Sequence, residues 1–170
     1  MSTTVDNITL ALISLQEDIQ TYLDDNKWKN QFNLALAGDD ILRGKELVLK
    51  VTDRRRQIAL PLITIETGMV RNLITELGDG SGEDVVTVTI LVRAIDGNQL
   101  RTITNLLRRR LNDRQFTIYD YRSINRDNLG TAELMDAVSN DVSDWNADNL
   151  AERYVSLINV TLKVTAQEFI

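Results

Sequence analysis

The feature that most constrains the fold is a strict two-residue alternation between positions 85 and 94. Its apolar members are Val86, Val88, Ile90, Val92 and Ala94. Successive side chains of a β-strand point to opposite faces, so this spacing predicts a strand with one buried face. Aliphatic residues of this kind are usually buried, and we therefore predict that this series belongs to the core rather than to an interface.

A helix is predicted directly after this strand. Asp96, Gly97 and Asn98 are residues typical of turns and helix caps. The apolar residues that follow, Leu100, Ile103, Leu107 and Leu111, share one helical face. A strand, turn and helix can bind phosphate, but such a turn needs several glycines so that backbone amides can approach the anion. The segment AIDGNQ has one glycine and an aspartate, which argues against a nucleotide site.

The arginines of this helix have three possible roles. They are Arg101, Arg108, Arg109 and Arg110, with Arg114 just beyond. They can lie on a solvated helix back, form salt bridges with another protein, or contact nucleic acid. The net charge of −6 and the absence of interleaved aromatic residues argue against nucleic acid.

Patterns elsewhere predict an α+β fold with a mainly antiparallel, mixed sheet and helices packed on one face. An amphipathic helix is expected over residues 8–23, and further strands over 47–51, 58–66, 116–121 and 154–165. A polar turn containing Arg54 and Arg55 joins the first two of these strands in a predicted hairpin. Pro61 places its strand at a sheet edge or marks a strand start. A chain of 170 residues is expected to form a single domain, residues 1–170.

Residues 127–152 differ from the rest of the chain because they contain acids but no lysine or arginine. We predict a long acidic loop insertion here, with a short helix over TAELMDAV (131–138). Other segments of the chain are basic. This separation of charge suits head-to-tail contacts between identical subunits, in which a basic patch meets an acidic patch. Neutralisation within one chain would produce the same sequence pattern.

Several kinds of chemistry are excluded by composition. The chain has no cysteine and no histidine, so disulfides, thiolate metal sites and histidine-dependent nucleophiles are impossible. Carboxylate sites for magnesium or calcium remain possible. GDGSGED (78–84) lacks the ligand spacing of an EF-hand and is expected to be a hairpin loop. We expect no catalytic residues, no cofactor, no metal and no membrane partner, and synthesis in the cytoplasm.

The pattern of elements resembles the tail terminator proteins of long-tailed bacteriophages. The features that carry the resemblance are the amphipathic first helix, ALPLITIETG (59–68), the strand running into DGNQLRTITNLLRRRL (96–111), and ERYVSLINVTLKV (152–164). The resemblance covers most of the chain, and it is a resemblance of pattern.

The resemblance implies a structural, non-enzymatic virion protein. Such proteins form a ring, usually a hexamer, at the head-proximal end of the tail tube. The ring ends tube polymerisation and joins the neck or head-completion protein, while DNA passes through the lumen without specific binding. The implied subunit contacts are Arg54, Arg55, Arg93, Arg108 and Arg109. The implied lumen or axial contacts are Asp136, Asp141, Asp144 and Asp148.

Three alternatives remain open. The chain could be another virion joining protein, such as a head-closure, neck, tail-completion or sheath-terminating subunit. It could be a small carboxylate-based or metal-dependent enzyme, which would need acids converging on a pocket. It could also be an adaptor domain that forms no ring.

Overall fold

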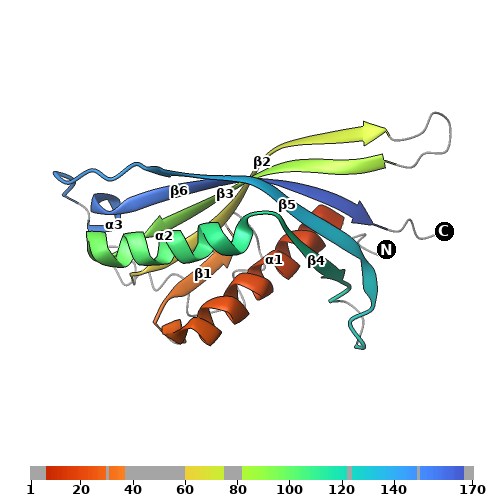
Figure 1. The fold of residues 1–170 in the computed structure, drawn as a ribbon, viewed down its shortest axis with the longest axis horizontal. Helices are drawn as coiled ribbons and strands as arrows, with labels where there is room; N and C mark the ends of the chain where they lie inside the picture. Colours follow the sequence, from red (N-terminus) through yellow and green to blue (C-terminus); the bar gives the residue numbers. More distant parts are fainter. Residues whose placement is uncertain are drawn as a thin grey trace.

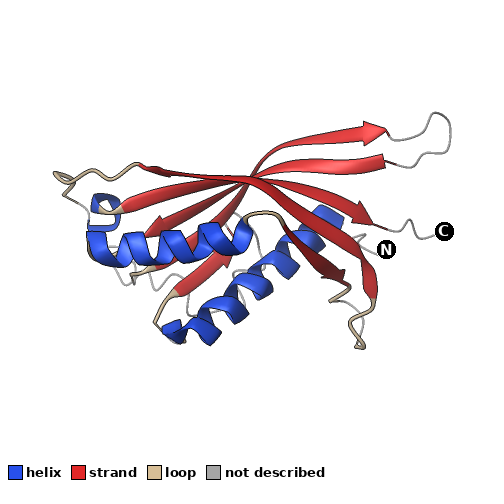
Figure 2. Cartoon of the chain, in the orientation of Figure 1, coloured by secondary structure: helices blue, strands red, loops and turns tan. Residues whose placement is uncertain are grey.

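The computed structural model of this chain shows a twisted six-stranded sheet with two helices packed on one face (Figures 1 and 2). It describes residues 7–29, 31–36, 60–74, 82–121, 124–148 and 150–166. In spatial order the strands are β1 (Asn33–Leu36), β2 (Leu62–Ile74), β3 (Gly82–Arg93), β6 (Val155–Ala166), β5 (Asn128–Asp141) and β4 (Arg114–Tyr119). Among the described strands only β1 and β2 pair in parallel, so the predicted α+β class with a mainly antiparallel sheet is confirmed.

The first helix, α1 (Asn7–Leu23), runs beneath the sheet and beside β4 (Figure 1). Leu15, Ile19 and Leu23 are buried as predicted. Leu10 and Ala11 are also buried, whereas Ile8 and Leu12 are only half-buried, so the buried face is rotated from the predicted stripe. The segment η1 (Asp24–Trp28) follows directly, and the chain leaves helical backbone geometry within it, at Asn26 and Lys27.

The second helix, α2 (Gly97–Leu111), begins with the predicted cap. Asp96 accepts a hydrogen bond from the backbone amide of Gln99 at 2.8 Å, and the Gln99 side chain accepts one from the amide of Ile95 at 2.9 Å. The first bond satisfies one of the amides that a helix start leaves without partners, and the second ties Gln99 back to the residue that precedes the cap. All four residues of the predicted apolar face, Leu100, Ile103, Leu107 and Leu111, are buried against the sheet.

The two central strands, β3 and β6, confirm the predicted alternation. Val86, Val88, Ile90 and Val92 are fully buried in the core, opposite Leu162, Val160, Ile158 and Ser156 of β6. The other face of these strands is more polar, and there Thr89 donates a 2.9 Å hydrogen bond to Asn159. The core therefore lies between the sheet and the two helices.

The strand containing the proline begins later than its sequence pattern predicts. Pro61 immediately precedes β2, which agrees with a strand start, and a bulge interrupts the β2–β3 pairing between Thr67 and Val70. The predicted strand over 47–51 and the turn with Arg54 and Arg55 lie outside the described residues. Residues 78–81 of the glycine-rich loop are also outside them, whereas Gly82 to Asp84 belong to β3.

The prediction of a long loop over 127–152 with a helix over 131–138 is wrong. Residues 128–141 form β5, which pairs with β4 on one side and β6 on the other. Leu129, Ala132 and Leu134 point into the core, while the acids occupy exposed positions. Pairing on both sides satisfies the backbone, and this outweighs the acidic composition. Of the predicted loop, only residues 142–148 remain irregular in the described chain, before the short helix α3 (Leu150–Arg153).

Within the described part of the chain, no helix has the length and apolar character needed to cross a bilayer.

Candidate functional site

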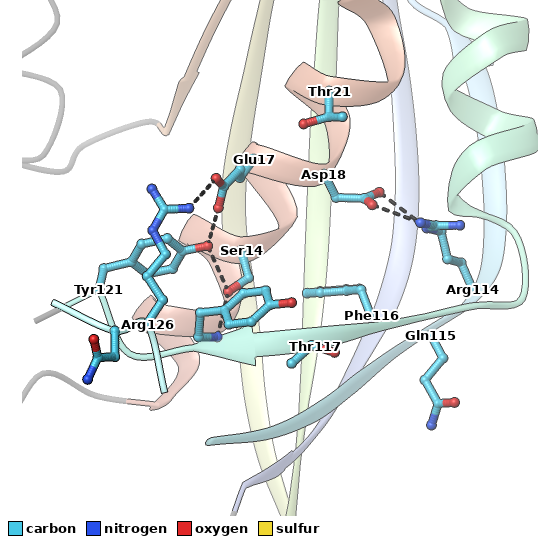
Figure 3. A pocket seen from close by; sticks show the side chains of 12 residues that line it. Ser14, Glu17, Asp18, Thr21, Arg114, Gln115, Phe116, Thr117, Tyr121 and Arg126 are labelled. Atoms are coloured by element: carbon cyan, nitrogen blue, oxygen red, sulfur yellow. Dashed lines mark hydrogen bonds and ion pairs between the residues drawn. The ribbon is translucent and has the colours of Figure 1, made fainter. Parts of the chain in front are cut away.

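A pocket lies between α1 and the edge strand β4 (Figure 3). Its volume is about 670 Å³. One wall is the face of α1 that carries Ser14, Glu17 and Asp18; the opposite wall is β4 and the segment that follows it. The pocket brings together charged groups that are about a hundred residues apart in the sequence, so their partners cannot be read from local patterns.

Asp18 is held by two arginines at one side of this pocket. Arg110 donates to it through Nε (3.2 Å) and Nη2 (3.0 Å), and Arg114 through Nε (3.2 Å) and Nη2 (2.8 Å). Two-pronged contacts between guanidinium and carboxylate groups are among the stronger hydrogen bonds in proteins. The Asp18 side chain is 14% exposed, so solvent screens these contacts only partly. This cluster fastens α1 to the end of α2 and the start of β4.

Glu17 forms a second cluster at the other side of the pocket. It accepts a 2.6 Å hydrogen bond from the Tyr121 hydroxyl and a 2.8 Å salt bridge from Arg126. Burial, and then the hydrogen bond to Glu17, raise the pKa of Tyr121 from 10.0 to about 12. The hydroxyl therefore stays protonated at neutral pH and acts as a donor; it is not a ready nucleophile.

Ser14 connects α1 directly to the edge of the sheet. Its hydroxyl donates to the carbonyl of Leu10 at 2.9 Å and accepts from the amide of Tyr119 at 3.2 Å. The second bond satisfies an amide of the edge strand that no neighbouring strand can reach. With Glu17 and Asp18 both facing cations, the pocket supports a role as a clamp that joins α1 to β4.

The predicted basic residues do not gather at this pocket. Arg108 and Arg109 lie exposed on α2, and Arg93 lies half-buried on the far face of the sheet, 3.4 Å from the Thr64 hydroxyl. Arg54 and Arg55 lie outside the described residues. Among the described residues, Arg101, Arg108 and Arg109 have no ion pair. We call these three side chains the basic α2 surface.

The predicted acidic residues are all exposed but occupy two places. Asp136 lies in β5 at the bulge between Met135 and Val138, with a φ of 56°. Asp141, Asp144 and Asp148 lie at or beyond the end of β5. Asp141 and Asp144 each accept a hydrogen bond from a backbone amide two residues later, so they shape the turns of this loop. None of the four meets the basic α2 surface within the described chain.

Sequence patterns missed an apolar cluster beside these acids. Trp145 is 65% exposed, and its ring meets the Tyr154 ring edge-on at 5.4 Å. Two backbone hydrogen bonds bring further exposed apolar residues to this place. The amide of Ala94, which precedes Ile95 (60% exposed), donates to the carbonyl of Tyr154, and the amide of Val142 donates to the carbonyl of Val155. A tryptophan within the acidic segment was the one available sequence signal. We call Ile95, Val142, Trp145 and Tyr154 the Trp145 knob.

Over the described ranges, no three acidic side chains are close enough together to hold a metal ion. No known protein family and no curated protein matches this chain.

Proposed function

We propose that this chain is a structural bacteriophage protein that assembles into a ring, of hexameric order, at the head-proximal end of a tail tube. In this role it ends tube polymerisation and provides the surface to which the neck or head-completion protein attaches. Its partners are further copies of itself, the tail tube protein and that joining protein. The function resides in the finished virion and involves no catalytic step and no cofactor.

The observation that carries this proposal is the separation of unpaired opposite charges. The basic α2 surface lies along α2 on the helix-covered side of the sheet, with Arg108 and Arg109 in the last turn of the helix. Asp141, Asp144 and Asp148 belong to the end of β5 and the loop that leads from it to α3, at the end of the molecule where α2 begins (Figure 1). Intramolecular pairing already satisfies Arg110, Arg114 and Arg126, so the remaining charges are available to a neighbour. Complementary patches at different places on one subunit favour head-to-tail contacts, which close into rings.

Two further observations support a structural role. The pocket between α1 and β4 is lined by residues that already pair with one another, and the pKa of its Tyr121 is raised away from neutrality. The pattern of elements resembles that of tail terminator proteins, and this resemblance is the reason for proposing the head-proximal end of the tail tube as the location. An excess of exposed acid would also prevent DNA from adhering as it passes through a lumen.

The test is electron microscopy of particles from a phage whose copy of the gene carries Leu107→Asp. Leu107 is fully buried, so a charge there should abolish folding. Asn105→Asp on the exposed side of the same helix is the matched control. Overlong tails without heads support the proposal. Tails of normal length without heads would assign a neck or other joining role instead, and normal particles would exclude both roles.

A further inference from the structure

The Trp145 knob is an ordered aromatic projection at one end of the molecule. Trp145 is 65% exposed, yet the loop beneath it is well bonded: Asp144 caps the amide of Asn146 at 3.2 Å, and Arg153 donates to the carbonyl of Ala147 at 2.8 Å. A large exposed aromatic side chain on a fixed loop is typical of an interface anchor, because little conformational entropy is lost when it binds.

The knob is surrounded by negative charge. Its neighbours Asp141, Asp144, Asp148 and Glu152 are all exposed, and the described residues give them no ion pair. An aromatic side chain with this rim fits a partner surface that is basic and able to cover a ring. Arginine meets both needs, because its planar guanidinium stacks on aromatic faces and pairs with carboxylates.

The structure contains such a surface where α2 ends and β4 begins. A depression of about 380 Å³ is lined by Tyr22, Asn112, one acid, Asp113, and three arginines, Arg109, Arg110 and Arg114. Two of these arginines, Arg110 and Arg114, share the carboxylate of Asp18, so the depression keeps an excess of positive charge that is carried mainly by Arg109. Arg110 is held over the Tyr22 ring at 4.9 Å while bonded to Asp18, so its guanidinium plane is already oriented. Arg109 has no ion pair among the described residues and can meet a carboxylate. We call this depression the arginine pocket.

We propose that the Trp145 knob of one copy docks into the arginine pocket of a second copy, with Trp145 against the guanidinium groups and the acidic rim against Arg109. Trp145 belongs to the loop that leads from β5 to α3, at one end of the long axis, whereas most of the residues that line the pocket come from the end of α2 and the start of β4 (Figure 1). Because the knob and the pocket are different patches, a copy that docks its knob keeps its own pocket free for a third copy. We propose this head-to-tail arrangement, which continues around a ring. This inference rests on the proposed function, for which it names the subunit interface.

Chemical cross-linking tests the contact directly, because the chain contains no cysteine. Asn146→Cys places a thiol beside the knob, and Asn112→Cys places one in the pocket; both positions are exposed and leave Trp145 and Arg109 intact. The two purified full-length variants are mixed and treated with a short bis-maleimide. We expect a cross-linked dimer that joins residue 146 of one copy to residue 112 of the other, identified by mass spectrometry.

Substitutions in the same backgrounds supply the energetic test. Trp145→Ala in the Asn146→Cys chain, or Arg109→Glu in the Asn112→Cys chain, should each reduce the cross-linking yield about tenfold, as expected for an interface anchor. Asp144→Arg combined with Arg109→Glu on the opposite copy should restore part of the yield. Ile124→Ala, at a fully exposed apolar residue outside both surfaces, is the matched control and should have no effect. Thermal melting checks that each variant is folded.

The outcomes separate this inference from the proposed function. Absence of the 146–112 product, a yield unchanged by Trp145→Ala, or products joining only like positions would overturn the proposed contact. Light scattering that still shows a closed oligomer would then retain the ring and require a different interface. Abnormal tails in the virion experiment, together with failed cross-linking, would likewise exclude this interface and retain the structural role.

Discussion

Arg114 donates two hydrogen bonds to Asp18 across 96 residues of sequence, with Nη2 2.8 Å from Oδ1 and Nε 3.2 Å from Oδ2. Arg110 binds the same carboxylate. One acid on α1 therefore fixes both the end of α2 and the start of β4. Its negative charge also offsets part of the repulsion between the two guanidinium groups that it holds near each other.

Loss of the Asp18 carboxylate should destabilise the fold. Asp18→Ala removes the charge-assisted bonds and leaves two partly buried cations facing each other, so we expect a loss of about 2–3 kcal/mol. The measurement is urea denaturation followed by circular dichroism. Asp25→Ala, at an exposed position just past the same helix, is the control and should change the free energy of unfolding by less than about 0.5 kcal/mol. Equal effects of the two substitutions would contradict the clamp.

The hydroxyl of Tyr121 should lose its proton at a higher pH than an ordinary tyrosine. Its pKa is raised to about 12 in the folded chain from an ordinary value of 10.0, so the folded state favours the protonated hydroxyl. The resulting stabilisation is complete below about pH 10 and is lost as the pH rises from about 10 to about 12. Ultraviolet absorbance should show a phase near pH 12 that disappears in Tyr121→Phe and persists in Tyr119→Phe. A late phase that survives Tyr121→Phe would refute this assignment.

The cap of α2 should contribute measurably to stability. Asp96→Ala leaves the Gln99 amide without its 2.8 Å partner, and we expect a loss of about 1 kcal/mol. Asn98→Ala changes an exposed side chain in the first turn that makes no capping bond and should be nearly neutral. Thermal denaturation of the two variants in parallel provides the comparison. The cap is unimportant if their melting temperatures coincide.

Thr104 offers a stabilising substitution. It is buried on α2, and its hydroxyl has no hydrogen-bond partner among the described residues. Thr104→Val keeps the shape and removes the unsatisfied group, so we expect a gain of about 1 kcal/mol. Thr102→Val is the control, because the Thr102 hydroxyl is exposed and bonds to the carbonyl of Asn98. A lower free energy of unfolding for Thr104→Val would indicate that the hydroxyl has a partner after all.

The sequence by itself determined the elements whose signals are local. Strict alternation predicted β3 and β6, and Asp96 with the apolar face after it predicted α2 and its cap. These signals suffice because strand and helix periods place side chains on one face whatever the rest of the chain does. Burial of Val86, Val88 and Ile90 follows from the same periodicity.

Only the tertiary structure decided the strand β5 and the clamp around Asp18. Acidic composition suggested a loop, but β4 and β6 supply hydrogen bonds on both sides, and Leu134 is buried beneath them. Sequence patterns left the roles of the α2 arginines open, whereas in the fold Arg110 pairs with Asp18 and Arg108 and Arg109 have no ion pair within the described chain. Strand pairing and ion pairing join residues far apart in sequence, so their partners exist only once the chain has folded.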